Sequence, residues 1–195
     1  MKLIAVEPSK EMILQRPVDA HPARQACAEA LPFADNAFSH AMTVLSMHHW
    51  QDRNTAFEQI KRVVTERFVA VTWNPEAEQY WLTKDYFSEI YEIDRSIFPK
   101  FDEIRCAFPG VRFYSLPIPA DCVDGFTAAY WARPRAYLDE EVRNSMSTFS
   151  KINDVSQGLQ RLRNDLDSGT WESKYGEIAS RSSLDVGYTI VVWDA

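Results

Sequence analysis

Short apolar runs of strand length alternate with helical patterns over residues 3–73, and this alternation constrains the fold more than any other feature of the sequence. Parallel strands need crossover connections, which are usually helices, so the alternation predicts a largely parallel sheet covered by helices. The runs place strands at residues 3–6, 24–28, 41–46 and 68–73. The sequence therefore predicts an α/β fold.

Two helices are predicted between these strands. Ser9 is placed to cap a short helix that ends before Pro17, because a serine side chain accepts a hydrogen bond from a free N–H of the first turn. Asp52 is placed to cap a second helix that runs to about Thr65. Its apolar residues share one face and are Ala56, Ile60, Val63 and Val64.

Helices dominate the pattern after Pro75, where many aromatic residues occur. The predicted elements are helices at 82–91, 101–107 and 154–167 and strands at 111–116 and 188–193. No linker is long enough to divide the chain, so we expect a single domain over residues 1–195. Its sheet core is predicted at 1–74, 111–118 and 186–195, and a helical lid at 75–110 and 119–185.

Composition excludes several classes of function. The net charge is −7 and no basic run occurs, which argues against a nucleic-acid partner because phosphate contacts need clustered cations. Three widely spaced cysteines suggest neither a disulfide framework nor a zinc site. No run approaches the ~18 apolar residues of a membrane helix. We therefore expect a soluble protein of the cytoplasm with no membrane partner and no metal.

Glu7 is the first residue that suggests chemistry, because it follows a predicted strand. A carboxylate at the carboxyl end of a parallel strand can accept hydrogen bonds from both hydroxyls of a ribose. The alternative is that Glu7 only decorates an exposed strand end.

Three segments occur in order and together resemble one family. They read Val-Glu-Pro-Ser at residues 6–9, Ala-Glu-Ala-Leu-Pro-Phe at 28–33 and His-His-Trp at 48–50. The chain resembles the class I S-adenosylmethionine-dependent methyltransferases of the methyltransferase-11 type, and the similarity extends over nearly its whole length. The resemblance implies a Rossmann-like sheet, mostly parallel with an antiparallel C-terminal strand, with helical lid insertions. The implied cofactor is S-adenosylmethionine, and the implied substrate is a small molecule.

The resemblance also assigns cofactor contacts to five residues. Glu7 would hold the ribose hydroxyls. Ala28 and Glu29 would lie along the adenine, with the backbone or the Glu29 carboxylate near the exocyclic amine. Phe33 would form a wall of the adenine pocket, and Ser46 would face the methionine part of the cofactor.

His48 and His49 would lie where methyl donor and acceptor meet. A histidine there suits a base or an orienting group, because imidazole titrates near neutral pH. The alternative is a packed turn in which Trp50 contacts the following helix. Metal binding is not expected, because adjacent side chains diverge and no third ligand lies nearby in sequence.

The aromatic residues of the lid allow two interpretations. They could line an acceptor pocket, since small-molecule sites are mostly apolar and aromatic, or they could form the core of the added helices. We expect core packing for most of them, with Tyr130 and Trp131 lining the substrate pocket.

The sequence departs from the family at its glycine-rich loop. In relatives, this loop precedes the ribose-binding acid by roughly twenty residues and lets the backbone approach the cofactor. Only six residues precede Glu7 here. We therefore expect a truncated sheet without its first strand and helix, or a natural start upstream of Met1, and cofactor binding is doubtful for the chain as given.

The absence of the first strand, which precedes the glycine-rich loop in relatives, has a structural consequence, because that strand is central in the family sheet. Its loss would leave the strands at 3–6 and 41–46 with open edges, and open edges invite pairing with another chain. We expect a homo-oligomer, specifically a homodimer. Two functions follow: methyl transfer from S-adenosylmethionine to a small molecule, or a non-catalytic, repurposed member that binds a ligand or assists a partner.

Overall fold

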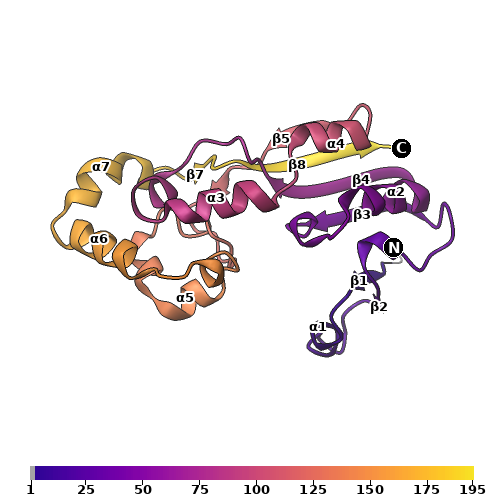
Figure 1. Cartoon of the computed structure of the whole chain (residues 1–195), viewed down its shortest axis with the longest axis horizontal. Coiled ribbons are helices and arrows are strands. Elements are labelled where there is room, and N and C mark those ends of the chain that lie inside the picture. Colours follow the sequence, from indigo (N-terminus) through magenta and orange to yellow (C-terminus); the bar gives the residue numbers. More distant parts are fainter. Residues whose placement is uncertain (1–2) are drawn as a thin grey trace. The chain divides into compact units, whose positions relative to one another are not determined.

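The computed structural model describes residues 3–195. Met1 and Lys2, which the sequence predicts as part of the sheet core, lie outside the described residues. The strands are β1 (Ala5–Glu7), β2 (Ala23–Gln25), β3 (Phe38–Val44), β4 (Val64–Trp73), β5 (Arg112–Ser115), β6 (Ile118–Pro119), β7 (Ser183–Leu184) and β8 (Tyr188–Asp194). The α-helices are α1 (Lys10–Leu14), α2 (Arg53–Val63), α3 (Ser88–Ile97), α4 (Phe101–Ala107), α5 (Glu140–Asn144), α6 (Ser156–Asp167) and α7 (Thr170–Ala179) (Figure 1).

The chain forms two compact units, described separately below. The sheet unit comprises Met1–Thr72, Phe101–Phe113 and Ile190–Ala195, and the helical unit comprises Trp73–Lys100 and Tyr114–Thr189. Among the helices that lie in the range predicted for the lid, α4 belongs to the sheet unit, whereas α3, α5, α6 and α7 belong to the helical unit. The single-domain organisation stays a prediction.

The strands confirm the predicted sheet type. β1 and β2 are parallel, as are β3 and β4 (Figure 1). The second sheet has the strand order β3-β4-β8-β5. β8 runs antiparallel to β4, because the N–H of Ala195 donates to Glu66 while that of Asn74 donates to Gly187. The fold is therefore a Rossmann-like α/β sheet, mostly parallel, with an antiparallel C-terminal strand.

Strands β1 and β3 of the sheet unit each have an open edge. β1 pairs only with β2, and β3 is one of the two outer strands of the four-stranded sheet. Within residues 3–195, no strand pairs with either edge, and β1 and β3 do not close on each other. Met42 and Val44 on β3 are 73% and 53% exposed, so apolar side chains accompany the open edge.

Helix α2 anchors the core of the sheet unit. Its N-cap is Asp52, as predicted: the carboxylate accepts the N–H of Thr55 at 3.1 Å and its hydroxyl at 2.6 Å. The Thr55 hydroxyl and N–H hold the pKa of Asp52 below its usual value. On the inner face of α2, Phe57 is fully buried and packs edge to face on Phe108, and the face also buries Ile60 and Val63.

An aromatic cluster forms the core of the helical unit. Its central residue is Trp81, which is 2% exposed and donates its indole N–H to the carbonyl of Trp131 at 2.9 Å. Four other rings meet it edge to face at centroid distances of 5.2–5.9 Å: Tyr80, Tyr86, Tyr137 and Trp171. Edge-to-face pairs add stability beyond the area that they bury, so these rings fix the helices of this unit.

Several predicted elements differ from the structure. The strand expected at 24–28 ends at Gln25, and a 3₁₀ turn at Ala28–Ala30 follows. The strand expected at 41–46 is Phe38–Val44, because Leu45 has a φ of 46° and ends it. The helix expected at 82–91 is a π-helix at Leu82–Tyr86 followed by α3. Helix α7 and strands β6 and β7 were not predicted.

Candidate functional site

Glu7 ends β1 beside Gln25 of β2, at the carboxyl edge of a parallel pair. Its side chain is half-buried. The carboxylate oxygen Oε1 accepts the N–H of Ser9 at 2.9 Å, while the Ser9 hydroxyl caps α1 as predicted. Among the described residues only Ser9 donates to this carboxylate, so its other oxygen keeps the capacity to accept a hydrogen bond from a ligand hydroxyl.

The predicted adenine segment lies in the 3₁₀ turn Ala28–Ala30. Glu29 accepts the N–H groups of Gln51 at 2.7 Å and Asp52 at 3.3 Å through one carboxylate oxygen. This carboxylate therefore ties the turn to the start of α2. The role of Ala28 and Glu29 beside an adenine stays a prediction.

Phe33 is half-buried and packs edge to face on Phe38, with ring centroids 4.8 Å apart. Its backbone is held by Arg62 at the end of α2, which donates to the carbonyls of Phe33 at 2.6 Å and Leu31 at 3.0 Å. The same guanidinium pairs with Asp35 at 2.9 Å. The sequence pattern gave no sign of this role, yet Arg62 fixes the Leu31–Phe33 end of the predicted adenine segment.

Ser46 and the two histidines follow the end of β3. The Ser46 hydroxyl bonds to that of Thr43, and the 3₁₀ turn Met47–His49 begins directly after it. The rings of His48 and His49 lie 4.0 Å apart, tilted by 45°. His48 is half-buried and His49 is exposed.

Trp50 ends this turn and packs on Phe57 of α2, with ring centroids 5.9 Å apart. The packed-turn interpretation is thereby confirmed for Trp50. This packing is compatible with a role of His48 or His49 as a base, and that role stays a prediction.

Tyr130 and Trp131 belong to the helical unit. Trp131 is fully buried and donates its indole N–H to the carbonyl of Ile118 at 2.9 Å. Tyr130 is half-buried, with the Arg133 guanidinium 4.4 Å from the centre of its ring. Neither residue lines the cavities of this unit, so their place in a substrate pocket stays a prediction.

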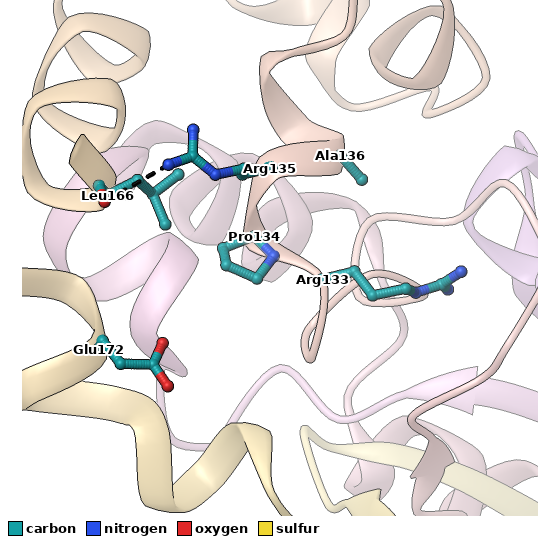
Figure 2. A pocket seen from close by; sticks show the side chains of 6 residues that line it. All are labelled: Arg133, Pro134, Arg135, Ala136, Leu166 and Glu172. Carbon is teal, nitrogen blue, oxygen red and sulfur yellow. Dashed lines mark hydrogen bonds between the residues drawn. The ribbon is translucent and has the colours of Figure 1, made fainter. Parts of the chain in front are cut away.

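The larger cavity, of about 360 Å³, lies in the helical unit (Figure 2). The two arginines that line it bind other groups of the chain. Arg135 extends toward Leu166 and pairs with Asp167 at 3.2 Å, whereas Arg133 points away and donates to the carbonyls of Ala129 and Cys122. Because Arg133 and Arg135 already bind carbonyl or carboxylate groups of the chain, we assign no function to this cavity.

Residues 3–195 contain neither a cluster of side chains that could hold a metal ion nor a helix that could span a membrane. No group of three or more His, Cys, Asp or Glu residues could hold a metal ion. No helix among them is both long and apolar enough to cross a membrane.

Residues 1–67 match the model of a family described as a methyltransferase domain. A shorter similarity, 46% identity over 41 residues, links the chain to the uncharacterized protein YafE of Escherichia coli (strain K12). That match covers 21% of this chain and 20% of YafE.

Solved structures extend the similarity to nearly the whole chain. A crystal structure from Anabaena variabilis, described as a methyltransferase from an antibiotic biosynthesis pathway, is 31% identical with a TM-score of 0.90. The alignment covers 98% of this chain and 81% of that one. The YcgJ protein of Bacillus subtilis shares the fold, with 17% identity, a TM-score of 0.51 and the same coverage of 98% and 81%.

Proposed function

Since this chain belongs to the S-adenosylmethionine-dependent methyltransferase family, we propose that it transfers a methyl group from S-adenosylmethionine to a small-molecule acceptor. The observation that carries the proposal is Glu7, whose half-buried carboxylate ends a parallel strand. One of its oxygens is fixed by Ser9, which leaves the other to accept a ribose hydroxyl. Nothing in the comparisons favours the alternative of a non-catalytic, repurposed member.

The other predicted residues have compatible chemistry. The turn at Ala28–Ala30 offers backbone groups to an adenine, and Phe33 offers an apolar ring beside it. Arg62 holds the Leu31–Phe33 end of this loop in place. When bound, the cofactor supplies an electrophilic methyl group on a sulfonium. Ser46 would face the methionine part of the cofactor.

In this proposal, His48 or His49 in the turn Met47–His49 takes up the proton that the methyl acceptor loses. In-line methyl transfer depends mainly on positioning, and a base adds to it where the acceptor must be deprotonated. An imidazole is suited to this task near neutral pH.

The acceptor class can be tested with tritium-labelled S-adenosylmethionine. The protein is incubated with a cell extract that has been separated into small molecules and retained macromolecules. We expect label to enter the small-molecule fraction, together with formation of S-adenosylhomocysteine. Label confined to protein or nucleic acid would contradict a small-molecule acceptor, and no transfer to any fraction would contradict the enzyme proposal.

The same assay tests the base. Replacing both His48 and His49 with alanine is expected to lower the rate about 10²-fold, the contribution of one general base. The matched control is His40→Ala, because His40 is an exposed histidine on β3 that faces Glu66 at 3.9 Å. Equal rates for the double variant and the control would remove the histidines from the mechanism.

Self-association through the open edges is part of the proposal. The outer strand β3 exposes Met42 and Val44, and an unpaired apolar edge favours pairing with a second chain. Sedimentation velocity at micromolar concentration should therefore show a dimer. Met42→Lys should shift the protein toward monomer, whereas Val123→Lys, at a residue 90% exposed in the helical unit, should not. A monomeric wild-type protein would refute this assembly.

A further inference from the structure

The helical unit contains a second, smaller cavity of about 20 Å³. A cavity of this size holds one or two water-sized groups, so it can take the end of a ligand but not a whole metabolite. Its walls combine aromatic rings with carboxylates, and none of the described residues that line it is a lysine, arginine or histidine. The residues that line it include Trp73, Glu78, Tyr80, Tyr91, Asp94 and Tyr188.

The aromatic residues present rings rather than free polar groups. The hydroxyl of Tyr80 donates to the carbonyl of Thr127 at 3.1 Å, and that of Tyr91 donates to the carbonyl of Ala77 at 2.9 Å. The rings of Tyr91 and Trp73 meet edge to face at 5.8 Å. With their polar ends engaged, these side chains are fixed in place as cavity walls.

Asp94 supplies the charge. It lies on α3 one turn after Tyr91, and residues at this spacing share a helix face. One of its oxygens accepts the hydroxyl of Thr148 at 3.0 Å, and no other described residue donates to the carboxylate. Burial raises the pKa of Asp94 to about 6, while Thr148 and the charge of Lys151 act in the opposite direction.

The tyrosine hydroxyls near Asp94 are uncharged near neutral pH. Burial raises the pKa of Tyr80 and of Tyr188 well above the usual value, so both hydroxyls keep their protons. Lys151 makes no ion pair with Asp94 among residues 3–195 and does not line the cavity. Above pH 6, Asp94 is therefore charged, and the described residues of the cavity wall are aromatic, apolar or polar side chains and the acidic residue Glu78, with no cation among them.

We propose that this cavity binds the terminal ammonium group of a small cationic ligand. An ammonium group is close to water in size, its charge pairs with a carboxylate, and the faces of aromatic rings attract cations. An anionic group would be repelled by Asp94 and Glu78, and a neutral group would leave the carboxylate uncompensated. This site goes beyond methyl transfer and needs no S-adenosylmethionine, so either proposal can fail without the other.

The probe is methylammonium chloride, and the readout is the indole N–H signal of Trp73 in a ¹H–¹⁵N NMR titration of the full chain at pH 7.5. Trp73 lines the cavity and donates its indole N–H to the carbonyl of Val186 at 2.8 Å, so occupancy should shift this signal. The signal is assigned by its loss in Trp73→Phe. We expect a saturable shift with methylammonium and none with methanol, its neutral counterpart of equal size.

Asp94→Asn should weaken methylammonium binding about tenfold or more, because the ion pair is lost. The matched control is Glu92→Gln, an exposed acid on the same helix that pairs with Arg95, and it should bind like the wild type. The absence of a saturable shift, equal binding of methanol, or unchanged affinity in Asp94→Asn would overturn the proposal. The methanol comparison uses the wild-type chain, so the test does not depend on whether the variant folds.

Discussion

Trp81→Ala is expected to lower the free energy of unfolding by about 3–5 kcal/mol, the usual cost of truncating a large buried aromatic residue. Trp81 is 2% exposed and meets four rings of the helical unit edge to face. Removing it opens a cavity and also leaves the buried carbonyl of Trp131 without its donor. Denaturant unfolding followed by circular dichroism measures the loss.

Two variants separate these contributions. Trp81→Phe keeps an aromatic ring but loses the indole N–H, so it should cost less than Trp81→Ala while still leaving the carbonyl unpaired. Val123→Ala, at a side chain 90% exposed, should stay within about 0.5 kcal/mol of the wild type. If Trp81→Ala unfolded like Val123→Ala, the aromatic cluster would not be the core of the helical unit.

The second large effect concerns Glu7. Glu7→Gln keeps the shape of the side chain but removes its charge, and hydrogen bonds to charged groups contribute about 1.5–3 kcal/mol. We therefore expect affinity for S-adenosylmethionine to fall between about tenfold and a hundredfold. The loss should be larger in binding than in stability, because the Ser9 N–H can still donate to the amide oxygen of the glutamine.

The sheet unit was predicted well because its signals are local. Asp52 and Ser9 cap α2 and α1 as expected, since a capping side chain acts within three residues of itself. The alternation of strands and helices also gave the correct sheet type. The predicted ends of the strands were less accurate. β3 ends where Leu45 takes a positive φ, and nothing in the sequence indicates this conformation at a leucine.

The helical unit was harder to predict because tertiary contacts decide its structure. The helix predicted at 154–167 is α6, but Gly169, with a φ of 76°, follows its C-cap Ser168 and begins α7, which was not predicted. The π-helix at Leu82–Tyr86 interrupts a stretch that has an ordinary helical pattern.

Residues of the site whose partners lie far away in the sequence could not be recognised from the sequence alone. Glu7 was visible because a strand precedes it directly. Arg62 was not, because its partners Leu31 and Phe33 lie about thirty residues earlier. Asp94 was missed for the same reason: an acid on an amphipathic helix normally faces solvent, and only the fold brings it beside Tyr80 and Tyr188.

The most direct test of the account is a calorimetric titration of S-adenosylhomocysteine into the wild-type chain, Glu7→Gln and Glu11→Gln. Glu11 is a nearby acid on α1 whose carboxylate accepts the Ser9 hydroxyl, so it controls for the loss of one negative charge in this segment. The account predicts micromolar binding by the wild type and Glu11→Gln, and binding at least about tenfold weaker by Glu7→Gln. Equal binding by all three chains, or none by the wild type, would contradict the assignment of Glu7 as the ribose-binding residue.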